Sequence, residues 1–250
     1  MIDPRTAPAP AAPSAVRVAL LECDHTDPEL RGIDGDYADM FTTLLARHAP
    51  SLELTRIDLI GGDPLPSLDA FDAHLVTGSR LDAVAGEDWI EDLAGFLRRA
   101  HQERRPTVGI CFGHQLIAHA LGGRVERAAT GWGVGVRDAR VTTNGAGAPG
   151  LPDRFRLLHS HQDQVLELPP GGEVMASSAH APIAALRVGS LLGFQGHPEF
   201  TPRYAEALMT SRSDRIDAEV ITEARRTLTT PTDHGDIARW IAGHLAGDSA

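Results

Sequence analysis

The stretch Thr107-Val-Gly-Ile-Cys-Phe-Gly-His-Gln115 decides the fold of this 250-residue chain. A short run typical of a buried strand, Thr107–Ile110, leads directly into a Gly-x-Cys-x-Gly pattern, and a helical pattern runs from Gln115 to Leu121. The two glycines permit a sharp, strained turn, because a Cβ atom beside the cysteine would collide with the turn itself. The stretch therefore predicts a strand, a tight turn carrying Cys111, and a helix that begins at once.

Strand and helix patterns alternate on the N-terminal side of this unit. Short apolar strands are expected at Val16–Leu21, Leu52–Ile60 and Phe71–Thr77, and amphipathic helices at Asp36–His48 and Trp89–His101. Alternation of this kind is typical of a mostly parallel sheet that helices cover on both faces. We therefore expect an α/β fold with a mostly parallel central sheet and helices on both of its faces.

The second half of the chain is richer in short β-like runs and ends in helical patterns. The expected strands are Val134–Val141, Arg154–Leu158, Val174–Ser177, Ile183–Val188 and Leu191–Gln195. Helical patterns follow at Pro202–Thr227 and Asp236–Leu245, and no internal repeat or interdomain linker is present. We therefore expect one domain over residues 15–250, with C-terminal helices within 202–245, preceded by a disordered Ala/Pro-rich leader over residues 1–14.

The overall charge excludes two classes of partner. Lys and Arg number 23 and Asp and Glu 34, which gives a net charge of −11. Nucleic acid and anionic membranes both need a basic surface, so neither is expected as a partner. No run approaches the ~18 apolar residues of a membrane span, and the leader lacks the apolar segment of a signal peptide. The two cysteines, Cys23 and Cys111, are far apart, so reduced thiols in the cytoplasm are expected rather than a disulfide framework.

Cys111 is the candidate nucleophile. The turn would place it at the N-terminus of the following helix, where the positive end of the helix dipole favours a thiolate. The same geometry would point backbone N–H groups, such as that of Phe112, at the oxyanion of a tetrahedral intermediate. The alternative is that Cys111 is a small buried apolar residue, which is the usual fate of a free cysteine. Cys23 lacks such surroundings and is expected to be structural.

His197 and Glu199 are the candidate base and orienting acid, among the twelve histidines of the chain. The segment Gly196-His-Pro-Glu199 follows a predicted strand, and the sites of parallel sheets collect at the carboxyl ends of strands. Pro198 favours an extended backbone, in which residues i and i+2 project to the same side. The order nucleophile, base, acid differs from the nucleophile, acid, base order of α/β-hydrolases. For this segment taken alone, a plain turn is the alternative.

Four motifs resemble the class I glutamine amidotransferase superfamily, and the resemblance extends from about Val16 to Phe200. In chain order they are Val76-Thr-Gly-Ser79, Gly109-Ile-Cys-Phe-Gly-His-Gln115, Ser160-His-Gln-Asp-Gln-Val165 and Gly196-His-Pro-Glu199. Within the superfamily, the chain looks closest to stand-alone members similar to the amidotransferase domain of GMP synthase and to plant γ-glutamyl peptidases. The resemblance implies a flavodoxin-like version of the α/β fold.

The resemblance implies an oxyanion hole and also shows one departure from the family. The backbone N–H of Gly78 would join that of Phe112 in holding the oxyanion. Gly78-Ser79-Arg80 replaces the Gly-Pro-Gly or Ser-Pro-Gly of amidotransferases that work with a synthase. Arg80 therefore stands where the family usually has glycine. Its guanidinium is expected either to pair with a substrate carboxylate or to point to solvent.

The resemblance further implies how the substrate is held. Gln115 and Asp163 would bind the α-amino and α-carboxylate end of a glutamine or γ-glutamyl group, and Ser160, His161 and Gln162 would lie beside it. Gln115 follows Cys111 by one helical turn and would face the same cleft. No Cys/His/Asp spacing supports a zinc site, so neither a metal nor another cofactor is expected.

Three functional hypotheses follow. The first is a cytoplasmic hydrolase that cleaves the γ-glutamyl amide bond of glutamine, or of a γ-glutamyl amine or peptide, through a glutamyl thioester. The second is a glutaminase subunit that delivers ammonia to a separately encoded synthase. The third is a non-catalytic binding module on the same fold. A small-molecule substrate is expected under the first two, and a synthase or a second copy of the chain remains open as a partner.

Overall fold

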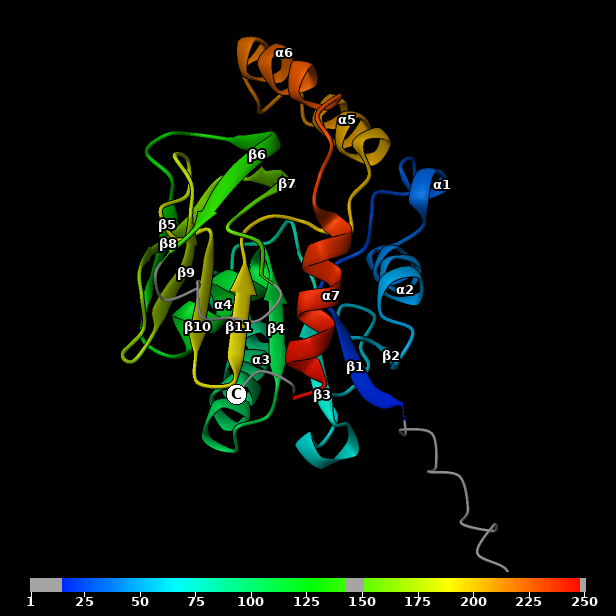
Figure 1. Ribbon diagram of the computed structural model, residues 1–250, viewed down its shortest axis with the longest axis vertical. Helices are drawn as coiled ribbons and strands as arrows, with labels where there is room; N and C mark the ends of the chain where they lie inside the picture. The colour runs from blue at the N-terminus through cyan, green and yellow to red at the C-terminus, as the bar shows by residue number, and fades with distance from the viewer. Residues whose placement is uncertain (1–14, 143–150, 248–250) are drawn as a thin grey trace, which may run out of the picture.

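The computed structural model describes residues 15–142 and 151–247 and shows one large sheet flanked by helices (Figure 1). The predicted leader over residues 1–14 lies outside the described residues. Nine strands form the sheet in the order β2-β1-β3-β4-β11-β10-β9-β6-β7, and β5 and β8 form a separate antiparallel pair. The strands are β1 (Val16–Glu22), β2 (Leu52–Asp58), β3 (Ala73–Val76), β4 (Thr107–Ile110), β5 (Arg124–Arg127), β6 (Gly133–Val141), β7 (Arg154–His161), β8 (Asp163–Glu167), β9 (Glu173–Ser177), β10 (Ala185–Val188) and β11 (Leu191–Phe194).

The sheet has a parallel half and an antiparallel half. The strands β2, β1, β3, β4 and β11 pair in parallel, so their carboxyl ends meet at one edge of the sheet. The strands β10, β9, β6 and β7 extend it in antiparallel pairing. The expected α/β fold is confirmed, and the parallel half contains both β4, which precedes Cys111, and β11, which precedes the Gly196–Glu199 segment.

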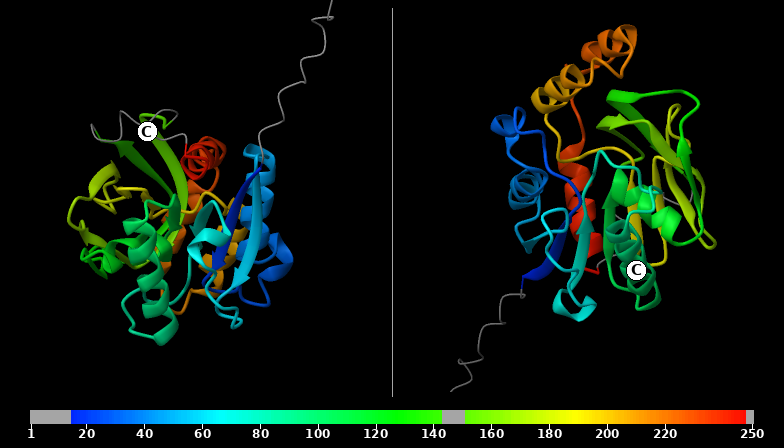
Figure 2. Two further views of the ribbon diagram at one scale, coloured as in Figure 1. Left: turned by 90° about the horizontal axis from the view of Figure 1, so that it is seen from below. Right: turned by 180° about the vertical axis from the view of Figure 1, so that it is seen from behind.

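Helices cover both faces of the parallel half because alternate strand residues are buried on opposite sides. The helices are α1 (Arg31–Asp34), α2 (Tyr37–His48), α3 (Asp88–Gln102), α4 (Phe112–Ala120), α5 (Pro202–Ser211), α6 (Ala218–Thr227) and α7 (His234–Leu245), with a 3-10 turn at Leu68–Ala70. In β1, Val18 and Leu20 belong to the core under α2 and α7, whereas Ala19 and Leu21 belong to the core under α3 and α4. Figure 2 shows α3 and α7 on opposite sides of the sheet.

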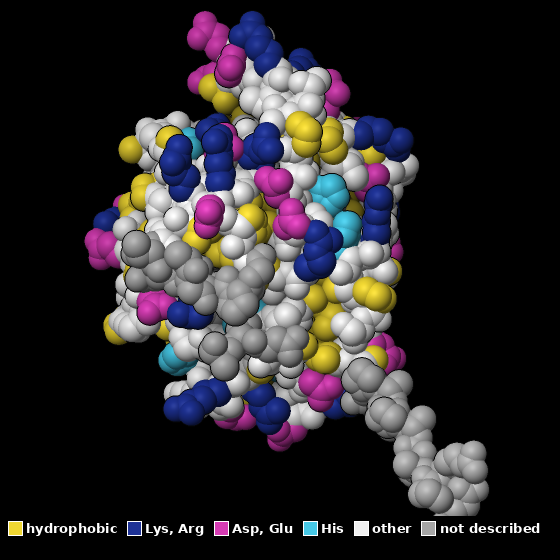
Figure 3. All heavy atoms as spheres, in the orientation of Figure 1, with side chains coloured by type: hydrophobic (Ala, Val, Ile, Leu, Met, Phe, Trp, Pro, Cys, Tyr) yellow, Lys and Arg dark blue, Asp and Glu magenta, His cyan; other side chains and the backbone are white. Residues whose placement is uncertain are grey.

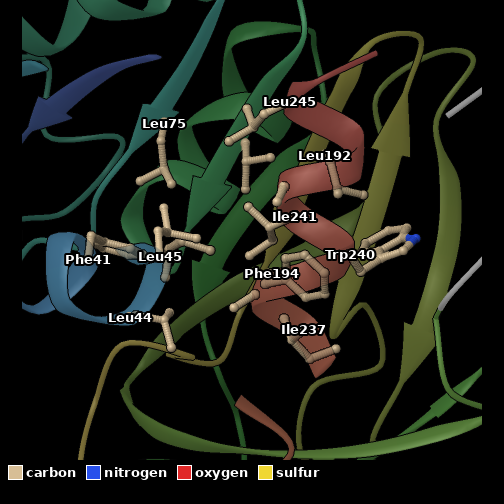
Figure 4. Packing of buried hydrophobic residues seen from close by; sticks show 14 of the residues in the cluster. Phe41, Leu44, Leu45, Leu75, Leu192, Phe194, Ile237, Trp240, Ile241 and Leu245 are labelled. Atoms are coloured by element: carbon tan, nitrogen blue, oxygen red, sulfur yellow. The ribbon is translucent and has the colours of Figure 1, made fainter. Parts of the chain in front are cut away.

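The core under α2 and α7 joins the two ends of the chain. Phe41 and Leu45 of α2 point toward Leu75 of β3, while Ile241 of α7 packs between them and Phe194 of β11 (Figure 4). All of these side chains are almost fully buried. The C-terminal helix is therefore part of the main core, and its packing holds the strand that leads into His197 and Glu199.

The C-terminal region contains three helices where the sequence predicted two. The expected Pro202–Thr227 helix is wrong as one unit, because the chain turns between α5 and α6. Backbone hydrogen bonds from Ser213 to Thr210 and from Arg215 to Arg212 close this turn. Serine and aspartate in this stretch compete with helical hydrogen bonds and favour caps and turns. As a result α5 and α6 project beyond one end of the sheet (Figure 1).

Two strands escaped the sequence prediction, and β7 extends well beyond its predicted end. The short strands β5 and β8 pair only with each other, and β7 continues past the predicted end at Leu158 as far as His161. None of the described helices is both long and apolar enough to cross a membrane.

Candidate active site

Cys111 lies at a strained turn between β4 and α4, as the sequence predicts. Its backbone has φ 50° and ψ −94°, a conformation that side chains other than glycine rarely adopt. A Cβ at Gly109 would overlap the carbonyl group of Gly113, and one at Gly113 would lie 2.7 Å from the Val76 oxygen. The Cys111 amide is fixed by donating to the carbonyl oxygen of Phe194 in β11 (2.7 Å). Both flanking glycines are therefore sterically required for this turn.

His197 and Glu199 lie at the carboxyl end of β11, the strand that pairs in parallel with β4. The His197 amide donates to the Leu158 carbonyl oxygen (2.8 Å), which fixes the backbone of the segment. Its Nδ1 lies 2.7 Å from Oε1 of Glu199. The two side chains are 4% and 0% exposed, so this hydrogen bond is shielded from water. The expected reach of residue i+2 back to residue i is present in this geometry.

The electrostatics of His197 favour its protonated form. Burial lowers the pKa of this imidazole, but the charge of Glu199 and the contact with Cys111 outweigh burial and raise the pKa to about 10. The Phe200 ring stacks on the imidazole, with ring centroids 3.9 Å apart and planes within 5°. His197 is therefore held from one edge by a carboxylate and on one face by an aromatic ring.

Two backbone amides lie where an oxyanion hole would be needed. Phe112 begins α4 immediately after Cys111, and Gly78 follows β3. A Cβ at Gly78 would lie 2.8 Å from His197 Cε1 and 3.7 Å from the Cys111 Cβ, so only glycine lets the backbone come this close. Within the described part of the chain, neither the Gly78 nor the Phe112 amide has a hydrogen-bond acceptor. Both amides are therefore available to a bound oxygen.

A cleft of about 170 Å³ opens beside Cys111 and brings together the residues predicted to bind substrate. Its lining includes Arg80, Gln115, Ser160, His161, Gln162 and Asp163, which are all six of the predicted residues. Further lining residues that were not predicted as site residues are Leu81 and Asp82, next to Arg80, and Arg127, Trp132, Arg212 and Arg215. Arg127 comes from β5 and Arg212 and Arg215 from the turn after α5, where the sequence shows no motif, whereas Trp132 lies in the glycine-rich stretch Gly131–Gly135 at the start of β6.

Gln115 and Asp163 are arranged around one backbone carbonyl. The Gln115 side-chain amide donates to the carbonyl oxygen of Asp163 (2.7 Å), and His161 Nδ1 lies 3.0 Å from the same oxygen. The Asp163 carboxylate faces Arg127, whose Nε is 3.5 Å away. Burial raises the pKa of Asp163, and Asp82 raises it further. Burial lowers the pKa of His161 to about 3, so its ring is neutral and forms part of the wall.

Gln195 is a residue of the site that the sequence analysis placed only in a strand. Its side chain is fully buried, and Nε2 lies 3.6 Å from the Cys111 sulfur. Gln115 Nε2 donates to the side-chain oxygen Oε1 of Gln195 (3.4 Å), which orients the Gln195 Nε2 toward the sulfur. The available signal was the position of a buried amide directly before the Gly196–Glu199 segment, where an apolar strand residue would be ordinary.

The arginines of the cleft differ in how they are held. Arg80 is bound by carboxylates on its own side, with Nη1 3.1 Å from Asp27 and Nη2 3.5 Å from Asp24. Arg212 donates from Nη1 to the Ser160 hydroxyl (2.6 Å) and lies over the Trp132 ring, 5.8 Å from its centroid. Of the two alternatives for Arg80, a position facing solvent and acidic neighbours fits better than a free substrate contact.

One cluster of side chains has the composition of a metal site but lies apart from the cleft. The ligand atoms of Glu22, His25 and Asp58 are within 4.8 Å of one another. Arg56 donates to both Glu22 and Asp58, so a guanidinium already balances their charge. No residue of this cluster lines the cleft of Cys111.

Comparison with known proteins places this geometry in a family context. The family model described as glutamine amidotransferase class-I matches residues 72–213. Gamma-glutamyl peptidase 5 of Arabidopsis thaliana is 32% identical over 175 residues, which cover 66% of this chain and 68% of the relative. A glutamine-hydrolyzing GMP synthase of Thermomicrobium roseum is 50% identical over 95 residues, which cover 38% of this chain and 18% of that protein. A glutamine amidotransferase structure from Thermotoga maritima covers 92% of this chain and 98% of its own, with TM-score 0.72 and 19% identity, and shows the same fold.

Proposed function

The chain belongs to the class-I glutamine amidotransferase family, and from this premise we propose that it is a cysteine-dependent hydrolase of γ-glutamyl amide bonds. The observation that carries the proposal is the placement of Cys111. Its strained turn opens into a cleft at the same sheet edge as the His197–Glu199 hydrogen bond of 2.7 Å. A nucleophile, a base and an orienting carboxylate in this relation are the requirement for acyl transfer.

The proposed reaction has two steps that share one set of groups. The Cys111 thiolate attacks the γ-carbonyl carbon, and the amides of Gly78 and Phe112 hold the negative oxygen that forms. Collapse of this intermediate breaks the C–N bond, and His197 gives its proton to the departing amine. The product is a glutamyl thioester on Cys111. Water then attacks the thioester carbonyl while His197 takes its proton, and glutamate leaves as the thiolate is restored.

Three neighbours position these groups. Glu199 holds the imidazole through Nδ1, which leaves the other ring nitrogen for proton transfer. The Phe200 ring fixes the plane of the imidazole by stacking. The buried amide of Gln195 points a donor at the sulfur, and this favours the thiolate over an uncharged thiol without taking part in proton transfer.

The acyl half of the substrate is expected to lie along β8 and α4. Asp163 lines the cleft with a partly buried carboxylate, which suits an α-ammonium group. The Gln115 amide, fixed by the Asp163 carbonyl, lies beside it. These contacts support a γ-glutamyl group as the acyl donor, in agreement with the reactions named for the relatives.

The leaving-group half is expected to carry negative charge. Four arginines line the cleft against two acids, Asp82 and Asp163, in a chain whose net charge is −11. Three of these arginines, Arg127, Arg212 and Arg215, lie away from the aspartates that hold Arg80. An arginine cluster against that background focuses a positive potential on the cleft and attracts carboxylates. This favours a γ-glutamyl peptide, whose leaving group ends in a carboxylate, over free glutamine, whose leaving group is ammonia.

The glutaminase-subunit hypothesis keeps one observation in its favour, the 50% identity to a GMP synthase over 95 residues. It predicts weak glutaminase activity in the isolated chain and a strong rise when a synthase is added. Peptide turnover by the isolated chain would decide against it.

The test is a substrate panel of glutamine, γ-glutamyl-p-nitroanilide and γ-glutamylglycine, with glutamate release as the readout. Wild type is compared with Cys111→Ala and with Cys23→Ala as the matched cysteine control. We expect turnover that falls at least ~10³-fold in Cys111→Ala and persists in Cys23→Ala. Absence of turnover on every substrate, or turnover that survives the Cys111 substitution, would overturn the proposal.

A further inference from the structure

A second cavity lies behind the segment that carries His197 and Glu199. Its volume is about 540 Å³, compared with about 170 Å³ for the cleft that contains Cys111. Four stretches enclose it: the end of α1 at Asp34, α2, residues 198–202, and the connection between α6 and α7 at residues 228–234. Cavities of a few hundred cubic ångströms with mainly apolar walls are typical of small-molecule sites.

The walls of this cavity combine an apolar body with polar groups. Met40, Leu44, Phe200 and Leu228 provide apolar surface, and three prolines add to it. Thr43 also lines the cavity. A ligand that fills this space would therefore need an apolar portion.

The polar lining contains one permanent cation, Arg47, beside two histidines, two acids and five threonines. Within the described residues the Arg47 guanidinium has no hydrogen-bond or ion-pair partner. Burial lowers the pKa of the neighbouring His48, and His234, Arg239 and Arg47 lower it further. Figure 3 shows histidine side chains at the surface on the side of α2 and α7, with arginine or lysine side chains beside them.

The two acids in the lining each have a hydrogen-bond partner other than Arg47. The Asp34 carboxylate accepts a hydrogen bond from the Thr201 hydroxyl. Glu199 is bonded to His197 through Oε1, while its buried Oε2 has no partner among the described residues. Neither balances Arg47, which is left as an unpaired guanidinium at the edge of an apolar space. A guanidinium binds a carboxylate with two parallel hydrogen bonds, and the pairing is strongest where water is partly excluded.

We propose that this cavity is a second ligand site, which takes a small organic carboxylate with an apolar body and acts on the active site through Phe200. Arg47 binds the carboxylate, and the apolar portion lies against Met40, Leu228 and Phe200. This site is separate from the cleft of Cys111, so its occupancy does not depend on the reaction proposed above.

Phe200 provides the physical connection between the two sites. Its ring lines the cavity and also stacks on His197, with ring centroids 3.9 Å apart. Pro198 and Glu199 also contribute to the cavity wall. A ligand that packs against this wall restricts the motion of the segment that holds the imidazole. If the ligand binds one position of Phe200 more tightly than another, it shifts the population toward that position.

Binding is tested on the Cys111→Ala protein, in which turnover cannot interfere. Calorimetric titrations use 4-phenylbutyrate, 4-phenylbutylamine and 4-phenylbutan-1-ol, which share one apolar body and differ in the head group. We expect 4-phenylbutyrate to bind at least tenfold more tightly than the other two. Arg47→Gln should weaken it tenfold or more and abolish this preference, whereas the control Arg99→Gln, on the exposed side of α3, should leave binding unchanged.

A second variant keeps the test independent of charge. Thr43→Trp fills the cavity from the exposed side of α2, so it should abolish binding of 4-phenylbutyrate while circular dichroism stays that of the parent protein. Binding of all three compounds with equal affinity, binding of none, or equal weakening by Arg47→Gln and Arg99→Gln would each overturn the proposed site.

The connection to the active site is tested on wild type with saturating 4-phenylbutyrate. We expect kcat for γ-glutamyl-p-nitroanilide to change at least twofold, with a shifted pH profile, and this change should be absent in Arg47→Gln. Tight binding that leaves kcat, KM and the pH profile unchanged would overturn the action through Phe200. Absence of turnover in wild type, with 4-phenylbutyrate still binding to the Cys111→Ala protein, would instead count only against the proposed reaction.

Discussion

Replacement of Glu199 by glutamine tests the proposed site at its most buried charge. The Glu199 side chain is 0% exposed, and its Oε1 lies 2.7 Å from His197 Nδ1. Burial alone would lower the pKa of His197, and the Glu199 charge is the first of the contributions that raise it to about 10. Without this carboxylate only the Cys111 contact opposes burial, so the pKa of the imidazole should fall toward or below its ordinary value of about 6.5.

The size of the effect follows from this shift. A fall from about 10 to below about 6.5 corresponds to roughly 5 kcal/mol of lost preference for the imidazolium, at about 1.4 kcal/mol per pKa unit. Because the Cys111 contact also raises the pKa, Glu199 accounts for only part of this free energy. An independent guide is the cost of breaking a buried charge pair, which is usually about 3–5 kcal/mol. Loss of orientation and of the protonated form together should lower kcat/KM by about 10²–10⁴-fold.

The assay combines a titration with kinetics. Nuclear magnetic resonance of the His197 Cε1–H signal gives the pKa of the imidazole in wild type and in Glu199→Gln. Turnover of γ-glutamyl-p-nitroanilide between pH 5 and 10 gives kcat/KM for both. Glu206→Gln is the matched control, because Glu206 is an exposed acid of the nearby α5. A wild-type imidazole that titrates near 6.5, or a variant with unchanged kcat/KM, would refute the reasoning.

Three further predictions concern the turn, the substrate and the pH dependence of stability. Gly109→Ala should lower the free energy of unfolding by at least ~3 kcal/mol in denaturant titrations, because its Cβ would overlap the backbone of α4. Gly95→Ala within α3, where the Cβ meets only an arginine tip at 3.7 Å, should instead stabilise by about 0.5–1 kcal/mol. Arg212→Gln should lower kcat/KM for γ-glutamylglycine about tenfold and for glutamine less than threefold, with Arg226→Gln as the control that changes neither. The raised pKa of His197 stabilises the fold fully below about pH 6.5 and progressively less as pH rises toward about 10, so unfolding free energies of wild type should fall across this window more than those of a His197→Gln variant.

Local motifs predicted the parts of the fold that local sterics determine. The strand, turn and helix around Cys111 are as expected, because the turn requires glycine at 109 and 113 and no distant residue can replace that requirement. The hydrogen bond between His197 and Glu199 followed from an extended i, i+2 relation and a proline between them. The break between α5 and α6 was missed because Pro202–Thr227 keeps a helical pattern of apolar residues on both sides of the turn. A turn that depends on Ser213 and Asp214 leaves little trace in periodicity.

Residues that come together from distant segments could not be predicted in the same way. Arg127, Arg212 and Arg215 are ordinary surface arginines in the sequence, and only the pairing of β5 with β8 and the turn after α5 bring them to one cleft. The unpaired Arg47 belongs to the same class, because its importance depends on a cavity closed by a segment about 180 residues away. The sequence showed Arg80 as the unusual residue, yet in the structure two aspartates hold its guanidinium.

The two halves of the proposed substrate site are therefore held in different ways. The groups that would act on the γ-glutamyl carbonyl are fixed by backbone geometry, by a strained turn, by a buried hydrogen bond and by glycine contacts that allow no other side chain. The groups that would meet the leaving portion are long arginines on a short strand and on the turn after α5, exposed at Arg127 and Arg215 and half-buried at Arg212, outside the main core, where a substitution costs little stability. Selection can therefore change the leaving group by single exchanges at Arg127, Arg212 or Arg215 while the chemistry at Cys111 stays intact. Substitution of Arg212 should thus alter the ratio of peptide to glutamine turnover without altering the reaction of Cys111 with a γ-glutamyl electrophile. A variant that loses both peptide turnover and the reaction of Cys111 would show that the two halves are not separable.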